Sequence, residues 1–295
     1  GSGKTRVLTR RIAYLIYTLG VKPYHILAVT FTNKAAKEME GRVKKILGEE
    51  LEGLWLGTFH AICARLLRRE TAWLPFNENF VIMDSDDQEA LIKRVFKELE
   101  LDEKLYNPFV VREIISRAKN NLVLPQEFVS RTYMEEVARR VYERYQQLLE
   151  NNNAVDFDDL LLWVVRLLTD HPETCARYAR RFEHVLVDEF QDTNLAQYEI
   201  VRLFSSFHHN LFVVGDEDQS IYRWRGADYR NVLRFTSDYP QARKILLEQN
   251  YRSTQNVLDV ARAVIDQNKS RTPKALFTTR KKGQPITLYE AVDEY

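Results

Sequence analysis

Short apolar runs alternate with amphipathic segments along much of the chain. The runs that read as buried strands cover residues 26–31, 54–58, 184–188 and 211–215. Apolar positions at helical spacing follow the first two runs, over about 34–47 and from 58 to about 69. Strand and helix units in this order predict a parallel sheet covered on both faces. The same pattern predicts further strands at 244–247 and 286–289, and a helix from about 254 to 268.

The pattern changes in the middle of the chain. No strand is evident between about residues 76 and 151. The stretch 85–88 is typical of a capping box at the start of a helix, and a long charged amphipathic helix is expected over about 133–150. The sequence therefore predicts these domains: residues 1–75 and 152–252 as two parts of one α/β unit, 76–151 as an inserted helical subdomain, and 253–295 as the start of a second α/β unit.

Composition indicates an ordinary globular protein, with 45% hydrophobic and 29% charged residues. Because the net charge is only +1, any binding of nucleic acid must come from local patches. The two cysteines, Cys63 and Cys175, lie far apart, so neither a disulfide framework nor a zinc site is expected. No signal peptide and no apolar run of about 18 residues is visible, which favours a cytoplasmic protein without a membrane partner.

The first five residues, Gly1-Ser2-Gly3-Lys4-Thr5, match the second half of a phosphate-binding loop. In such a loop, the lysine reaches the β and γ phosphates and the threonine hydroxyl binds Mg²⁺. The alternative interpretation is a flexible Gly/Ser terminus. Apolar positions at helical spacing begin directly after Thr5, which favours the phosphate loop.

Two consecutive carboxylates, Asp188 and Glu189, follow the apolar run at 185–187. Ligands of open α/β sheets bind at the carboxyl ends of strands. Asp188 could support Mg²⁺, and Glu189 could accept a proton from an attacking water. An acidic loop after a strand is common, so the pair indicates ATP hydrolysis only in combination with Lys4 and Thr5.

The stretch from Gly215 to Ala227 also follows an apolar run. The amide of Gln219 could sense a γ-phosphate. Tyr222 and Trp224 alternate with arginines, including Arg225, and this pattern suits single-stranded DNA because bases stack on rings while guanidinium groups meet phosphates. The alternative is that Trp224 belongs to the core.

A further motif, residues 247–253, contains Tyr251 and Arg252. An arginine at a domain edge can stabilise the charge that develops on a transferred phosphoryl group. The tyrosine could stack on a base. An exposed arginine is more often simply solvated, so this motif gains its meaning from the others.

Seven motifs in this order closely resemble the superfamily 1 DNA helicases of the UvrD, PcrA and Rep type. They are GSGKT, VTFTNKAA, GTFH, DFDDL, VDEFQDTN, GDEDQSIYRWRGA and NYRS, and together they extend over essentially the whole chain. The resemblance implies a RecA-like P-loop NTPase sheet with an inserted all-helical subdomain. It identifies the sequence as an N-terminal part of the helicase motor.

The resemblance also assigns roles to individual residues. It implies catalytic roles for Glu189 as general base and for Asp188, Lys4, Gln219 and Arg252. The implied nucleotide-binding residues are Gly1, Ser2, Gly3, Lys4, Thr5, Arg6, Tyr251, which would stack on adenine, and Arg252. Thr5 and Asp188 would hold Mg²⁺. The implied DNA-binding residues are Phe31, Thr32, Asn33, Thr58, His60, Tyr222, Trp224 and Arg225.

The resemblance implies an ATP- and Mg²⁺-dependent motor that moves 3′ to 5′ along single-stranded DNA and unwinds duplexes at single-strand/double-strand junctions. The helical insertion would face the duplex. Such a protein would act in DNA repair or replication, in a bacterial cytoplasm at the nucleoid, with loading or repair partners that the sequence does not name.

The family motifs on either side of these 295 residues are not in the sequence, including the opening half of the phosphate loop. The 295 residues alone are therefore expected to turn over Mg-ATP at close to background rate. Two other interpretations stay open: the motor part of a helicase–nuclease, and a single-stranded DNA-binding module with a vestigial nucleotide site. The intact set of candidate catalytic residues argues against the second.

Overall fold

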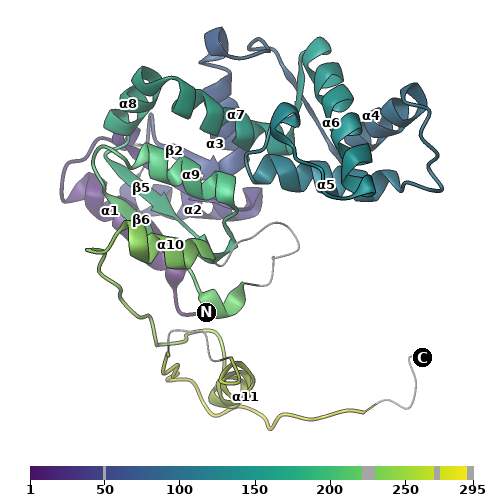
Figure 1. Cartoon of the computed structure of the whole chain (residues 1–295). Coiled ribbons are helices and arrows are strands. Elements are labelled where there is room, and N and C mark those ends of the chain that lie inside the picture. Colours follow the sequence, from purple (N-terminus) through teal and green to yellow (C-terminus); the bar gives the residue numbers. More distant parts are fainter. Residues whose placement is uncertain (49–50, 221–229, 269–272, 291–295) are drawn as a thin grey trace.

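The centre of the protein is a parallel sheet, as the apolar runs predict (Figure 1). The computed structural model describes residues 1–48, 51–220, 230–268 and 273–290. The sheet has the strand order β2-β1-β5-β6. Its strands are β1 (Ile26–Thr30), β2 (Trp55–Thr58), β5 (His184–Val187) and β6 (Leu211–Val213). Ala28 on β1 is level with Leu56 and Leu186 on its two neighbours, so the strands end at one common edge.

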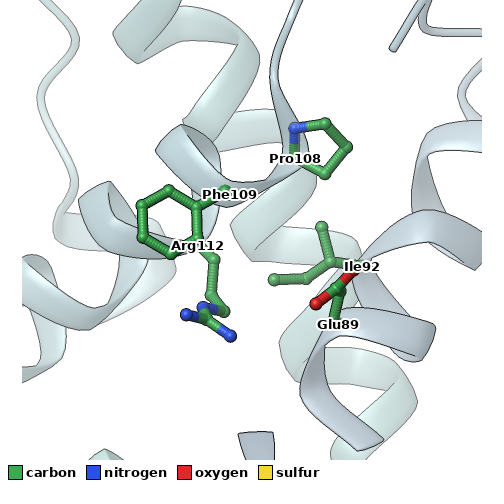
Figure 2. Close-up of a pocket in the computed structure, with 5 residues that line it drawn as sticks. All are labelled: Glu89, Ile92, Pro108, Phe109 and Arg112. Atoms are coloured by element: carbon green, nitrogen blue, oxygen red, sulfur yellow. The ribbon is translucent and has the colours of Figure 1, made fainter. Parts of the chain in front are cut away.

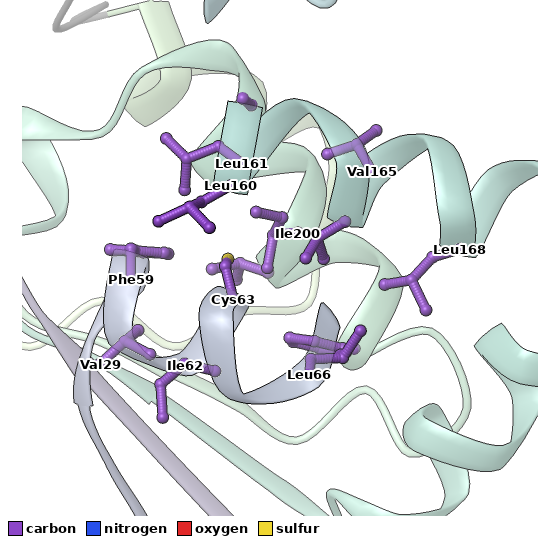
Figure 3. Close-up of a cluster of buried hydrophobic side chains, with 14 of the residues drawn as sticks. Val29, Phe59, Ile62, Cys63, Leu66, Leu160, Leu161, Val165, Leu168 and Ile200 are labelled. Atoms are coloured by element: carbon purple, nitrogen blue, oxygen red, sulfur yellow. The ribbon is translucent and has the colours of Figure 1, made fainter. Parts of the chain in front are cut away.

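Alternate residues of β1 face two different layers of helices. Ile26 and Ala28 pack against α1 (Lys4–Tyr17) and α2 (Asn33–Leu47). Leu27 and Val29 belong to the larger core on the opposite face, where Figure 3 shows Val29 beside side chains of α3, α7 and α9. The helices of this second layer are α3 (Phe59–Leu67), α7 (Phe157–Asp170), α8 (Pro172–Arg181) and α9 (Leu195–Phe204), with α10 (Arg230–Asp238) beside them. The prediction of a parallel sheet covered on both faces is confirmed.

The segment between β2 and β5 contains helices that build a separate apolar core. These helices are α4 (Ser85–Glu98), α5 (Pro108–Asn120) and α6 (Tyr133–Asn151). They lie together at one side of the sheet in Figure 1, around Val95, Phe96, Val111, Val141 and Tyr145. This agrees with the predicted fold class, an α/β sheet with a helical insertion. The exact domain boundaries stay predictions.

The expectation that no strand lies between residues 76 and 151 is wrong. Strand β3 (Val81–Met83) pairs in parallel with β4 (Ala154–Asp156). A run of three residues is too short to show alternation, and Val81 is exposed, so the pairing depends on a partner some 70 residues away in the sequence. The capping box begins at Asp84 rather than Ser85, since Asp84 accepts from the backbone N–H of Asp87 and the carboxylate of Asp87 accepts from that of Asp84.

The strands predicted at 244–247 and 286–289 are also absent from the described structure. Ile245 is 68% exposed and Leu288 is 92% exposed, so neither run has found a neighbouring strand to cover it. The only pairing described in this part of the chain is an isolated bridge between Gln249 and Phe277. The helix predicted after Ser253 is present as α11 (Gln255–Ile265).

Short 3₁₀ turns connect several of these elements, at Pro23–His25, Thr71–Trp73, Pro125–Glu127, Phe190–Asp192 and Glu217–Gln219. The last two lie in the loops that follow β5 and β6, at the carboxyl edge of the sheet. None of the helices in the described part of the chain has the length and apolar character needed to cross a bilayer.

Candidate functional site

The loop before α1 ends in a residue with left-handed backbone geometry. Gly3 has φ 87° and ψ 20°, which favours glycine because a Cβ would be strained there. Helix α1 then begins at Lys4, and no described side chain caps its N-terminus. The free N–H groups and the positive end of the helix dipole suit an anion such as a phosphate.

Lys4 points toward the carboxylates that follow two neighbouring strands. Its Nζ lies 3.6 Å from Oε2 of Glu189, after β5, and 3.8 Å from Oδ2 of Asp216, after β6. The lysine side chain is only 13% exposed. Both distances exceed those of tight ion pairs, so the ammonium group remains available to a negatively charged ligand.

Thr5 contacts the other carboxylate of the strand-end pair. Its hydroxyl donates a hydrogen bond to Oδ2 of Asp188 at 3.0 Å, and the backbone N–H of Glu189 donates to Oδ1 of Asp188 at 3.0 Å. Burial, followed by the charge of Glu189, raises the pKa of Asp188. A cation bound beside Thr5 would offset this cost of burying charge, and hydroxyl and carboxylate oxygens are ligands that Mg²⁺ accepts.

Gln191 connects the loops that follow β5 and β6, a role that the sequence did not reveal. Its Nε2 donates to Oε2 of Glu189 and to Oδ2 of Asp192, both at 3.1 Å. Its Oε1 accepts from the backbone N–H of Asp216 at 2.8 Å. A Cβ at Gly215 would lie 2.8 Å from Oε1 of Gln191, so glycine permits this close approach.

Glu189 itself has a left-handed φ of 48°, a sparsely populated conformation for a residue with a side chain.

Asp216 forms a second centre of interactions at this edge. It accepts from Nε2 of Gln219 at 2.6 Å and forms an ion pair with Lys274 at 2.5 Å. Burial acts to raise the pKa of Asp216, but the hydrogen bond and charge of Lys274 and the charge of Lys4 outweigh it, so the pKa is lowered. The sequence does contain a signal for Asp216, because this carboxylate follows an apolar run just as Asp188 does. Nothing in the sequence around Lys274 indicated its role.

Tyr251 and Arg252 reach the phosphate loop from the far part of the chain. The backbone N–H of Tyr251 donates to the carbonyl of Gly1 at 3.1 Å. Asn250 holds this turn, since its side-chain oxygen accepts from the backbone N–H groups of Arg252 and Ser253 at 2.9 and 2.8 Å. The side chains of Tyr251 and Arg252 are exposed toward the solvent, and both residues line the same cavity as the loop.

This cavity has a volume of about 750 Å³, which is large enough for a nucleotide. The predicted residues that line it are Gly1, Ser2, Gly3, Lys4, Thr5, Arg6, Glu189, Gln219, Tyr251 and Arg252, and Asp188 adjoins them through Thr5. Figure 2 shows a much smaller hollow between α4 and α5, beside Pro108 and Arg112. Its volume of about 10 Å³ has room for about one water molecule, so it is no candidate for a ligand site.

The candidate DNA-binding residues that the structure describes lie at the carboxyl ends of β1 and β2. The ring of Phe31 meets that of Phe59 edge-on at 5.6 Å. Thr32 and Thr58 each cap a helix, accepting from the backbone N–H groups of Ala35 and Ala61 at 3.1 and 3.2 Å. Both threonines therefore have a structural role, whatever else they contact.

The other candidates on this surface are Asn33 and His60. Asn33 is the first, exposed residue of α2. His60 lies edge-on to Phe157 at 5.8 Å, and burial lowers its pKa, which favours the neutral imidazole. The remaining candidates, Tyr222, Trp224 and Arg225, lie outside the described residues.

Comparison with known proteins agrees with this geometry. Residues 1–240 match the family model of the UvrD/REP helicase N-terminal domain, and residues 245–295 match that of the UvrD-like helicase C-terminal domain. Relatives named ATP-dependent DNA helicase PcrA are 48% identical in Staphylococcus epidermidis and 49% identical in Bacillus subtilis, over the full length of this chain. The chain spans only about 41% and 40% of those two proteins. Because the first family model covers most of its length, the chain belongs to the UvrD/REP helicase family.

Proposed function

We propose that this chain carries the ATP-hydrolysing site of a DNA helicase that moves along single-stranded DNA. The observation that carries the proposal is the placement of Lys4 and Thr5 opposite Glu189 and Asp188 at one cavity of about 750 Å³. A lysine, a hydroxyl and two carboxylates in this arrangement are typical of the sites at which P-loop enzymes hydrolyse ATP. The names of the PcrA relatives support ATP as the nucleotide and DNA as the substrate.

Mg²⁺ would be held by Thr5 and Asp188. In the described part of the chain, no group of three or more His, Cys, Asp or Glu side chains could hold a metal by itself. Two protein oxygens are nevertheless sufficient for Mg²⁺, which usually keeps several waters and takes further ligands from nucleotide phosphates. When bound, the ion supplies positive charge against the β and γ phosphates.

The other residues of the cavity have separable roles in the proposed reaction. Lys4 exchanges its long contacts with Glu189 and Asp216 for phosphate oxygens. Glu189 takes the proton of the attacking water at its carboxylate. Arg252, positioned by Asn250, stabilises charge on the transferred phosphoryl group, and Tyr251 stacks on the base. Gln219 lines the same cavity, donates a hydrogen bond to Asp216, and would sense the γ-phosphate.

The DNA-facing residues share an edge of the sheet with the nucleotide site. Phe31 follows β1 directly. Strand β1 lies beside β5, and Asp188 and Glu189 follow β5. A change in the strand-end loops on hydrolysis can therefore reach a base stacked on Phe31 through adjacent strands. We propose 3′ to 5′ movement on single-stranded DNA, unwinding at junctions, and a role in repair or replication in the bacterial cytoplasm.

Unwinding of tailed duplexes by the full-length gene product tests this function. We expect strand separation of a duplex with a 3′ single-stranded tail, dependent on ATP and Mg²⁺, and little separation of the matched duplex with a 5′ tail. A single-stranded DNA-binding module with a vestigial site would bind both tails without hydrolysis. The proposal would fail if neither duplex were unwound while single-stranded DNA left the rate of ATP hydrolysis unchanged.

Replacing Thr5 by valine tests the metal site. Valine has nearly the shape of threonine but lacks the hydroxyl that contacts Asp188. We expect Mg-ATP affinity to fall about tenfold, as for the loss of one hydrogen bond to a charged group, and affinity for ATP in EDTA to change little. Thr5→Ser keeps the hydroxyl and is the matched control. Equal losses with and without Mg²⁺, measured with a fluorescent ATP analogue, would place Thr5 outside the metal site.

A further inference from the structure

Three arginine side chains surround the indole of Trp55. The guanidinium carbons of Arg65, Arg69 and Arg181 lie 4.2, 5.1 and 5.5 Å from the centre of the ring. Trp55 itself is fully buried, so the ring forms a fixed base against which the guanidinium groups rest. Stacking of this kind orders an arginine while leaving its N–H edge free for an anion.

The three arginines have no carboxylate partner among the described residues. The nearby acids are engaged elsewhere: Glu70 pairs with Arg177 at 2.6 Å, and Glu183 lies 3.5 Å from His25. Nε of Arg181 is buried and has no hydrogen-bond partner in the described structure. An unpaired, buried charged donor is costly, and an anion bound to the other N–H groups of this guanidinium would offset part of that cost.

The electrostatic environment of Arg65 points the same way. Burial and then the charges of Arg69 and Arg181 lower the pKa of its guanidinium. Arg65 and Arg69 are exposed, so their guanidinium groups meet the solvent while they rest on the ring of Trp55. Residues held against mutual repulsion are typical of sites that bind a ligand of opposite charge.

This cluster lies away from the proposed nucleotide and DNA sites. Trp55 is the first residue of β2, and Thr58 at its other end belongs to the carboxyl edge. Arg181 ends α8, directly before β5 begins, so the cluster lies at the amino edge of the sheet. In Figure 1, α8 lies at the end of the lobe opposite to the chain's N-terminus, where the phosphate loop begins.

We propose that Arg65, Arg69 and Arg181 form a second oxyanion site that binds a phosphate group. Guanidinium forks match the geometry of phosphate oxygens and can hold them with two parallel hydrogen bonds. The phosphate could belong to a nucleic-acid backbone or to a free phosphate, and the same recognition chemistry serves both. Because this site is separate from the ATP cavity, its existence does not depend on the proposed helicase function.

Titration of the ¹⁵N-labelled chain followed by NMR tests the proposal. The resonances of the Trp55 indole N–H and the Arg181 Nε–H report directly on the site. Both titrations use protein that carries Lys4→Ala, so that the phosphate loop binds less of the added phosphate. Inorganic phosphate and single-stranded oligothymidylate are added at equal concentrations of phosphate groups. We expect saturable shifts, with affinity about tenfold lower in Arg65→Gln/Arg69→Gln.

Matched variants separate specific binding from general charge. Arg68→Gln removes an adjacent exposed arginine that rests on Phe80 instead of Trp55, and it should leave the shifts unchanged. Arg65→Lys/Arg69→Lys keeps the charge but loses the forks, and it should weaken binding even if the glutamine variant does not fold. If the oligonucleotide saturates the site at the lower concentration of phosphate groups, the ligand is a nucleic-acid backbone. If only inorganic phosphate saturates the site, the ligand is a free phosphate. Linear shifts that are equal in all variants would mean an adventitious ion only and would overturn the proposal.

Discussion

Glu189→Gln in the full-length gene product is expected to lower DNA-stimulated ATP turnover by about 10²- to 10⁴-fold, the usual contribution of a general base. Glutamine has nearly the same shape as glutamate but cannot accept a proton at neutral pH. ATP affinity should not fall, because the substitution removes a negative charge 3.6 Å from Nζ of Lys4. The measurement is phosphate release with and without single-stranded DNA, together with binding of a fluorescent ATP analogue.

Asp192→Asn is the matched control for this variant. Asp192 also accepts a hydrogen bond from Gln191, and burial followed by the charge of Glu189 raises its pKa to about 6. The control therefore makes the same chemical change in the same loop, at a residue that does not line the nucleotide cavity. We expect turnover close to that of the unmodified protein.

Two results would count against Glu189 as the base. One is Glu189→Gln protein that hydrolyses ATP and unwinds DNA at the normal rate. The other is an equal loss in Asp192→Asn, which would indicate that the loop as a whole, held by Gln191, is what the substitutions disturb. A loss confined to Glu189→Gln, with ATP still bound, is the expected outcome.

The sheet could be predicted because each of its strands corresponds to a short apolar run of neighbouring residues in the sequence. All five residues of β1 are buried and its first four are apolar, and such a run is typical of a strand covered on both faces. β3 was missed because its three residues carry no such signal. The run at 244–247 was overpredicted, since apolar residues form a strand only where a neighbouring strand supplies hydrogen bonds.

The candidate site was predictable wherever a motif places a residue at the end of a strand or the start of a helix. Lys4, Asp188 and Glu189 are of this kind. Gln191 and Lys274 were not predictable, because their roles depend on contacts with Asp216, which lies 25 and 58 positions away in the sequence. Pairings at this distance follow from the three-dimensional arrangement of the loops and leave no periodic signal in the sequence.

A buried ion cluster between the helical insertion and the α/β unit was missed for the same reason. Lys119, on α5, is fully buried with its Nζ 2.7 Å from Oδ2 of Asp156 and 2.8 Å from Oδ1 of Asp159. The hydroxyl of Tyr145, on α6, donates to Oδ2 of Asp156 at 3.1 Å. Asp156 and Asp159 also cap α7, so one cluster joins the insertion to a helix that packs beneath the sheet.

Replacing Lys119 by methionine is therefore expected to lower the free energy of unfolding by about 3–5 kcal/mol. Methionine preserves most of the side-chain volume but leaves Asp156 and Asp159 buried together without a cation. Burial and the charge of Asp156 already raise the pKa of Asp159 to about 7, and removing Lys119 should raise it further. The measurement is urea denaturation followed by circular dichroism.

The pH dependence distinguishes lost charge pairing from lost packing. A carboxyl group whose pKa is higher in the folded than in the unfolded chain binds extra protons on folding, so the destabilisation of Lys119→Met should shrink as the pH falls. Lys93→Met is the matched control, since Lys93 lies in the same insertion and pairs with Glu89 at the surface, with its side chain 48% exposed. Its expected cost is below about 1 kcal/mol. A similar loss in both variants, or a loss in Lys119→Met that does not vary with pH, would show that the buried cluster is not what holds the insertion against α7.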